Sequence, residues 1–211
     1  MARGRFGRWY DREVLSRVLD LGMRGVDELR ASLLTAARGR VLEIGFGTGS
    51  NLPHYPAAVD SLVAVEPSEG LASVAGRRLA QWGRPHEVVV QSGSRPLPLA
   101  PASFDTVVIT FVLCSARRVP ELLTEARRML RSDGALLIAE HQVASGSLQR
   151  ACQRALRPAW KACLGGCDPT ARPREHLQAA GFDTSGLVDT RLRLPWIVRP
   201  GLVGVARVSG E

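Results

Sequence analysis

Three glycines and two carboxylates carry the clearest chemistry in this 211-residue sequence. In Glu43-Ile44-Gly45-Phe46-Gly47-Thr48-Gly49, glycines alternate directly after a short apolar run typical of a buried strand. Glycine lets the backbone turn tightly and approach a ligand, and a helix opening behind it would offer free N–H groups. The dinucleotide fingerprint G-x-G-x-x-G fails, because its last position falls on Ser50. The pattern therefore predicts a ligand loop of the form E-x-G-x-G-x-G, followed by a helix.

Glu66 is the second carboxylate, at the end of the next apolar run and just before Pro67 and Ser68. A carboxylate at the end of such a strand can accept hydrogen bonds from both hydroxyls of a ribose, because it offers two oxygens to adjacent donors. The sequence thus favours a nucleoside ligand.

Strands and helices must alternate to place these residues together. Apolar runs predict strands at residues 40–45, 61–65, 87–90 and 104–113, and at 135–140 after a Ser132-Asp133-Gly134 turn; helical patterns cover 6–19, 26–34, 70–82 and 120–130. Later helices are expected near 147–160 and 173–180, with a hairpin of strands 187–194 and 202–208 at one sheet edge. Alternation of this kind predicts a doubly wound α/β protein, with a parallel sheet covered by helices on both faces.

Composition and charge exclude several classes. Hydrophobic residues make up 45% of the chain and charged ones 23%, as in a globular domain, and no apolar run is long enough to span a membrane. The net charge of +8 comes almost wholly from Arg, since Lys161 is the sole lysine. Residues 1–40 carry +4 and 117–174 carry +6, whereas 41–116, which hold the glycine loop, carry −2. The charge is better explained by Arg-rich coding than by nucleic acid, which we do not expect as a partner.

With these motifs the sequence resembles the class I S-adenosylmethionine-dependent methyltransferases with a type 11 methyltransferase domain. The specific part lies in segments 41–49, 63–67 and 103–105. A narrower likeness, to the methyltransferase-like group that contains thiol S-methyltransferases, rests on segments 51–56, 112–115, 140–141, 158–160 and 166–167. The resemblance implies a Rossmann-like sheet of seven strands whose last strand is antiparallel.

The same resemblance implies S-adenosyl-L-methionine as cofactor and assigns roles to particular residues. Gly45, Gly47 and Gly49 would lie against it, Glu66 on its ribose and Ser94 near the adenine. Phe111 and Val112 would flank the sulfonium, and Tyr10 would close over the methionine part or simply pack. The expected set also includes Glu43, Phe46, Asn51, Pro67 and Ser68.

The acceptor side has two readings for each residue that could do chemistry. Glu140 and His141 end the fifth strand, where one could act as a base, although internal pairing and packing of both is favoured. Cys152, Cys163 and Cys167 lack the paired spacing of zinc sites, so we expect packing residues and no metal. Cys114 is expected to form a wall of the pocket.

We therefore expect methyl transfer to a small, lipophilic acceptor such as a thiol. The alternatives are a lipid or nucleic-acid methyltransferase and an adenosyl-binding module without catalysis. Residues 1–40 are expected to form a helical lid and 41–211 the methyltransferase domain. A cytoplasmic location is expected, because no apolar signal segment follows the basic start. Residues 1–30, basic and amphipathic, also suit peripheral contact with a membrane.

Overall fold

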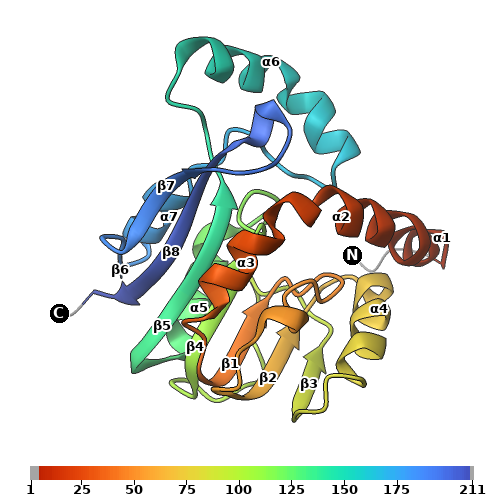
Figure 1. Cartoon of the computed structure of the whole chain (residues 1–211), viewed down its shortest axis with the longest axis vertical. Helices are drawn as coiled ribbons and strands as arrows, with labels where there is room; N and C mark the ends of the chain where they lie inside the picture. Colours follow the sequence, from red (N-terminus) through yellow and green to blue (C-terminus); the bar gives the residue numbers. More distant parts are fainter. Residues whose placement is uncertain (1–4, 210–211) are drawn as a thin grey trace.

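Eight strands of the computed structural model, which describes residues 5–209, form a sheet in the order β3-β2-β1-β4-β5-β8-β6, with β7 paired to β8 (Figure 1). They are β1 Gly39–Ile44, β2 Val59–Val65, β3 His86–Val89, β4 Phe104–Thr110, β5 Leu130–His141, β6 Phe182–Asp183, β7 Leu187–Arg191 and β8 Pro200–Val208. The first five strands pair in parallel, and β8 pairs antiparallel with β5 and β7. The predicted doubly wound sheet, its antiparallel last strand and the late hairpin are confirmed; the two-residue β6 makes the strand count eight.

The helices cover both faces of this sheet. They are α1 Arg5–Tyr10, α2 Ser16–Gly22, α3 Asp27–Leu34, α4 Glu69–Leu79, α5 Val119–Met129, α6 Ser147–Cys163 and α7 Pro173–Ala179; a π-helical turn, Asp11–Leu15, joins α1 to α2. Helices α5 and α7 share one buried apolar cluster with the sheet, and α3 and α4 share another on the opposite face. A third, smaller cluster joins Val26 to residues 192–198 and is flanked by Trp160 of α6. No helix among residues 5–209 has the length and apolar character needed to cross a bilayer.

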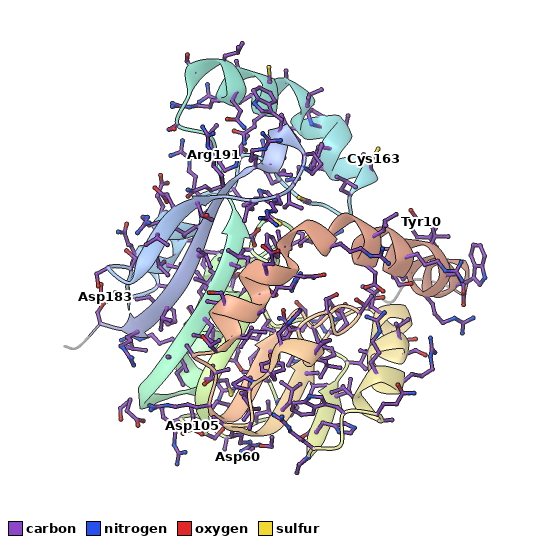
Figure 2. All side chains as sticks on the ribbon, in the orientation of Figure 1. Tyr10, Asp60, Asp105, Cys163, Asp183 and Arg191 are labelled. Carbon is purple, nitrogen blue, oxygen red and sulfur yellow. The ribbon has the colours of Figure 1, made fainter. Side chains whose placement is uncertain are left out.

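Parallel strands explain why the functional residues meet. The carboxyl ends of β1, β2, β4 and β5 lie at one edge, below the N-terminal helices in Figure 1. Figure 2 places Asp60 and Asp105 at the opposite edge, with Tyr10 and Cys163 on the side of the carboxyl ends. Asp105 there accepts a hydrogen bond from the Arg40 backbone N–H (2.8 Å), so it braces the start of β1.

Three local expectations were wrong. The glycine loop leads not into a helix but into one 3₁₀ turn, Leu52–His54. Pro53 and Pro56 explain the difference: Pro56 pushes the preceding Tyr55 to an extended conformation (ψ 123°). The predicted Ser132-Asp133-Gly134 turn lies inside β5 as a bulge, because Phe104 pairs with Leu130 whereas Thr106 pairs with Ala135. Finally, β4 ends at Thr110 instead of residue 113.

The segment before β1 has two parts. Helices α1 and α2 lie above the strand ends. Helix α1 and the π-helical turn contact α4, and Asp20 of α2 forms an ion pair with Arg78 of α4. Helix α3 instead packs on the sheet, where Leu33 and Leu34 are buried in the core. Gly39 and Arg40 already belong to β1.

Candidate active site

The glycine loop leaves β1 in a conformation that glycine alone adopts readily. Gly45, Gly47 and Gly49 have φ of +78°, +60° and +84°. The Gly45 and Phe46 N–H groups donate to the Val65 carbonyl (2.8 and 3.1 Å) and so tie the loop to the end of β2. A Cβ on Gly47 would meet only one atom within 4 Å, the Gly45 carbonyl oxygen at 4.0 Å, so this part of the loop faces open space.

Glu66 holds the loop against the start of α4. Its Oε2 accepts from the Gly47 N–H (2.9 Å) and its Oε1 from the Ser68 N–H (2.8 Å). Burial raises the pKa of this carboxyl, and the two backbone donors oppose that rise. Each carboxylate oxygen keeps a second lone pair, and so the group can still accept from a ligand hydroxyl.

The N-terminal helices are fastened to the same loop by two carboxylates. Asp11, buried, accepts from the Ser68 hydroxyl (2.8 Å). Asp20 of α2 accepts from the Thr48 hydroxyl (2.6 Å) and forms an ion pair with Arg78 of α4 (2.5 Å). These contacts hold α1 and α2 over the carboxyl edge of β1 and β2. Tyr10, in the same segment, is 38% exposed.

A buried polar network stands behind the loop. Glu43 accepts from Asn51 Nδ2 (2.8 Å) and from the Tyr55 hydroxyl (2.5 Å), and Arg30 donates to Asn51 Oδ1 (2.6 Å) and Thr110 Oγ1 (3.2 Å). Burial raises the pKa of Glu43 to about 7. Asn51 and Glu43 were both expected to bind the cofactor. Their side-chain polar atoms instead form hydrogen bonds within this network.

The end of β4 turns sharply toward the loop. Phe111 is a non-glycine residue with φ of +57°, held by its N–H on the Ala139 carbonyl (2.8 Å). Its ring lies under the Arg30 guanidinium, 5.3 Å from ring centroid to Cζ. Val112 packs on the loop so closely that a Cβ on Gly45 would lie 2.3 Å from its Cγ2.

Beyond Val112 two cysteines and a histidine converge. One ligand atom each from Cys114, His141 and Cys167 lie within 4.8 Å of one another, and His141 Nε2 is 3.0 Å from Cys167 Sγ. Hydrogen bonding from Cys114 and the nearby His141 lower the pKa of Cys167 to about 5, although burial opposes the change. The pKa of Cys114 is raised by the same bond and by burial.

Glu140 lies beside this cluster and is fully buried. Its Oε2 accepts from the Cys114 N–H (3.3 Å) and its Oε1 from the His141 N–H (3.0 Å); burial raises the pKa of its carboxyl. The internal placement favoured from the sequence for Glu140 and His141 matches this geometry. Their contact with an acceptor stays a prediction.

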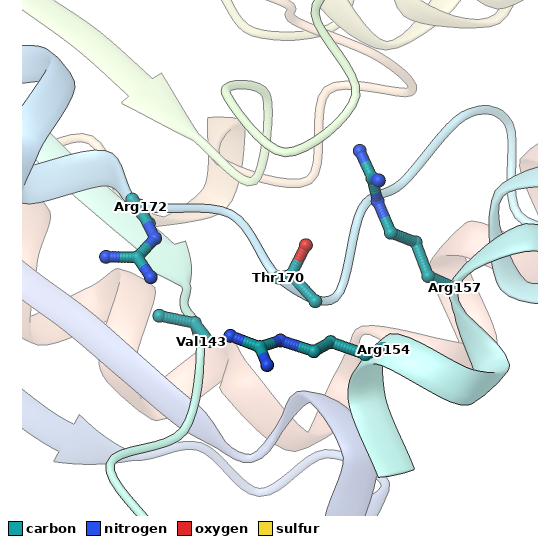
Figure 3. Close-up of a pocket in the computed structure, with 5 residues that line it drawn as sticks. All are labelled: Val143, Arg154, Arg157, Thr170 and Arg172. Atoms are coloured by element: carbon teal, nitrogen blue, oxygen red, sulfur yellow. The ribbon is translucent and has the colours of Figure 1, made fainter. Parts of the chain in front are cut away.

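Two further residues of the expected cofactor set, Pro67 and Ser94, are at least partly exposed. Pro67 is exposed, and Ser94 is half-buried with its N–H on the Ser92 hydroxyl (3.3 Å). A separate pocket of about 380 Å³ is lined by Val143, Arg154, Arg157, Thr170 and Arg172, whose side chains are drawn in Figure 3. Arg157 and Thr170 both bind Asp168, the residue after Cys167 (2.7 Å each), so the pocket borders the cysteine cluster.

Sequence reasoning missed the cluster as a unit, together with Arg30 and Asp11. It had grouped Cys167 with Cys152 and Cys163, which are neighbours along the chain. One signal was present: Cys114 and His141 follow or end adjacent parallel strands, so their side chains had to share an edge. Arg30 gave no signal, because a buried arginine in an N-terminal helix has no pattern in sequence.

Comparison with known proteins identifies the fold and the relatives. The methyltransferase domain family matches residues 42–138. The human thiol S-methyltransferase TMT1A is 34% identical over 173 residues, which cover 79% of this chain and 69% of that protein. Human TMT1B is 34% identical over 182 residues, 82% of this chain and 73% of its own length.

Two solved structures illustrate the fold. A SAM-dependent methyltransferase from Thermotoga maritima superposes with a TM-score of 0.68 at 20% identity, covering 95% of this chain and 98% of its own. The methyltransferase CalH, solved with SAH, superposes with a TM-score of 0.65 at 22% identity, covering 92% of this chain and 59% of its own.

Proposed function

The chain belongs to the S-adenosylmethionine-dependent methyltransferases, in the group that includes the thiol S-methyltransferases, and on that premise we propose that its acceptor is a small, lipophilic thiol. The observation that carries the proposal is the 34% identity to TMT1A across 79% of this chain, which includes the acceptor-side segments as well as the glycine loop. The apolar and sulfur-containing end of β4, with Phe111, Val112 and Cys114, is consistent with such an acceptor.

S-adenosylmethionine supplies an electrophilic sulfonium methyl group when bound. The residues present fit it: the open space at Gly47 accommodates a ligand against the backbone, and Glu66 can accept from ribose hydroxyls beside that space. We assign Gly45, Gly47 and Gly49 to the loop that meets the cofactor. Ser68 and Pro67 would border the ribose, with Ser94 toward the adenine.

The chain's contribution to the reaction is then orientation and exclusion of water. A nucleophile held in line with an electrophilic carbon gains about 7–11 kcal/mol from proximity and orientation alone. Phe111 and Val112 form the wall next to the methyl group, and α1 and α2 close the cofactor side through Asp11 and Asp20. A lid was expected over residues 1–40. In this view residues 5–22 form the lid, and Tyr10 is part of it.

Glu140 and His141 are positioning residues in this scheme. Both are buried and bonded within the protein, Glu140 to the Cys114 backbone and His141 to the Cys167 thiol. A thiol acceptor has an ordinary pKa of about 8.5 and is partly ionised near neutral pH, so a strong general base is not required.

A single-turnover assay tests the acceptor class. The protein with radiolabelled S-adenosylmethionine is offered an alkanethiol, a primary amine, a quinol, phosphatidylethanolamine vesicles and RNA in parallel. We expect a thioether from the alkanethiol and at least tenfold slower transfer to every other acceptor. Faster transfer to nitrogen, oxygen or carbon would overturn the thiol assignment, and tight cofactor binding with no transfer to any acceptor would favour a binding module.

The N-terminal helices also present apolar side chains to solvent: Trp9, Tyr10 and Leu21 are 49%, 38% and 67% exposed. Together with the basic start of the chain, they support peripheral contact with anionic lipid, which would concentrate lipophilic thiols near the enzyme. Flotation with phosphatidylserine vesicles, with and without residues 1–22, tests this contact and leaves α3 and Arg30 in place. Equal flotation of the two proteins would contradict it.

A further inference from the structure

Cys114, His141 and Cys167 form a compact set of soft ligands that the sheet and the loop after α6 bring together. Cys114 follows β4, His141 ends β5, and Cys167 lies in the loop that follows α6. The Asp168 N–H donates to the Cys114 carbonyl (2.9 Å), so the backbone of the two cysteine segments is joined directly. The ligand atoms thus come from the ends of two adjacent parallel strands and from a loop that is hydrogen-bonded to one of these ends.

We propose that these three residues bind a zinc ion whose fourth position takes the thiolate of the methyl acceptor. Tetrahedral zinc with bonds of about 2.3 Å to sulfur and about 2.0 Å to nitrogen separates its ligand atoms by roughly 3.5–3.8 Å. The three atoms here already lie within 4.8 Å of one another, with one pair at 3.0 Å. Changes of up to about 1 Å in the separations between these side-chain atoms would complete the geometry.

The ligand chemistry favours zinc over the harder cations. Two thiolates and an imidazole are soft or borderline donors, which select zinc rather than magnesium or calcium. Three protein ligands with a fourth open position is the arrangement of catalytic zinc sites, including the Cys₂His type. His141 is 3% exposed, with its Nε2 3.0 Å from Cys167 Sγ, and its Nδ1 has no hydrogen-bond partner among the described residues, so the cluster as it stands is not a satisfied polar network.

The position of the cluster connects it to methyl transfer. Cys114 Sγ lies 3.9 Å from the carbonyl oxygen of Phe111, and Val112 packs directly on Gly45 of the glycine loop. The cluster is therefore adjacent in structure to the wall that the cofactor's methyl group is expected to face. This part of the inference rests on the proposed thiol acceptor.

The chemistry balances without a further reactant. The acceptor R–SH loses its proton to solvent as sulfur binds zinc, because a coordinated thiol is deprotonated. That sulfur attacks the methyl carbon; the carbon–sulfonium bond breaks, and its electron pair remains on the sulfur of S-adenosylhomocysteine. The two cysteine thiolates balance the charge of Zn²⁺, so binding of the acceptor thiolate gives the site a net charge of −1. This negative charge is attracted to the positive sulfonium. The neutral thioether is a weaker ligand and leaves.

Metal titration of the full-length protein tests the site without any turnover. After treatment with a chelator, Co²⁺ is added and the thiolate-to-cobalt absorption recorded, and bound zinc is measured by mass spectrometry. We expect one metal per chain. Cys114→Ser, His141→Asn and Cys167→Ser should each weaken cobalt binding by more than the roughly 100-fold that loss of an outer-shell partner costs. Cys163→Ser, at the exposed end of α6, and Cys152→Ser are matched controls and should bind as the parent does.

The outcomes separate this inference from the proposed function. Adding an alkanethiol to the cobalt protein, with S-adenosylhomocysteine in place of the cofactor, should shift the cobalt spectrum. Sub-stoichiometric binding by the parent, or an equal loss in the control variants, would overturn the metal site even if variants of the cluster fail to fold. A metal-free protein that methylates thiols as fast as the zinc-loaded protein overturns the role of the metal in the transfer and leaves the proposed function intact. A metal-loaded protein whose spectrum ignores thiols overturns the open position, and failure of every thiol in the acceptor assay overturns the proposed function alone.

Discussion

Glu43→Gln tests the buried network behind the glycine loop through the pH dependence of stability. Glu43 is 2% exposed and accepts from Asn51 and Tyr55, yet burial raises the pKa of its carboxyl from 4.5 to about 7. Gln has nearly the same shape and no charge. Since the Tyr55 hydroxyl can accept as well as donate, the amide can keep both contacts.

The sign follows from which state holds the proton. Between pH 4.5 and 7 the folded protein keeps Glu43 protonated and the unfolded chain does not, so stability is fully present below pH 4.5 and falls as the pH rises. At about 1.4 kcal/mol per pKa unit, the shift is worth about 3 kcal/mol. Gln does not titrate, so the stability of the variant does not fall in this way. The difference in free energy of unfolding, parent minus variant, should therefore fall by about 3 kcal/mol between pH 4.5 and 7.

Urea unfolding of both proteins at several pH values between 4.5 and 8 measures this difference. Glu125→Gln, measured from well below pH 4.5 upwards, is the control of opposite sign: Arg128, 2.6 Å away, lowers the pKa of Glu125 below 4.5, so the advantage of the parent over that variant should grow as the pH rises toward 4.5 and change little above it. Parallel pH profiles for the parent and Glu43→Gln would refute the reasoning, because they would mean that Glu43 titrates alike in the folded and unfolded states.

Four further substitutions probe the site. Glu66→Ala should weaken S-adenosylmethionine binding about 10- to 100-fold by calorimetry, the worth of charge-assisted hydrogen bonds; unchanged affinity would remove it from the site. Gly45→Ala should lower the free energy of unfolding by about 3 kcal/mol, from overpacking on Val112 and its φ of +78°, and Val112→Ala should restore part of this, whereas strictly additive losses would contradict the contact. Asp20→Ala should cost less than about 1 kcal/mol of stability, because its ion pair is part-exposed, yet should speed cofactor release in stopped flow if α2 is a lid. Phe111→Gly should be about 1 kcal/mol more stable than Phe111→Ala, since both lose the ring and glycine alone tolerates φ of +57°; equal denaturation midpoints would argue against strain there.

The sheet was predictable because its signal is local. Buried parallel strands such as 41–44 and 62–65 read as short apolar runs, and glycine or an acid marks their carboxyl ends. Parallel order then places Gly45, Glu66 and His141 at one edge whatever the details of the connections. The sequence therefore locates the two candidate halves of the site, which are the glycine loop with Glu66 and the ends of β4 and β5. It does not predict how these halves come together.

What sequence could not give depends on contacts between distant segments or on local competition. Pro53 and Pro56 prevent the expected helix after Gly49. In place of that helix, the loop is supported by the hydrogen bond from Arg30 to Asn51 (2.6 Å), whose partners are 21 residues apart. The cluster of Cys114, His141 and Cys167 brings together residues 26 and 27 positions apart, and the position of Cys167 depends on a loop whose Asp168 N–H donates to the Cys114 carbonyl. No pattern in sequence carries that information.

Phe111 connects the glycine loop with the cluster of Cys114, His141 and Cys167. Its strained backbone costs about 1–3 kcal/mol, and three contacts hold it there: the Ala139 carbonyl below, the Arg30 guanidinium above, and its own carbonyl toward Cys114 Sγ. Relaxing φ to the ordinary region would swing Val112 away from Gly45 and Cys114 away from His141 together. The glycine loop and the cluster of Cys114, His141 and Cys167 therefore depend on one local geometry. A change that frees Phe111 should impair the proposed cofactor binding and the proposed metal binding in parallel, whereas a change confined to Cys167 should leave the glycine loop undisturbed.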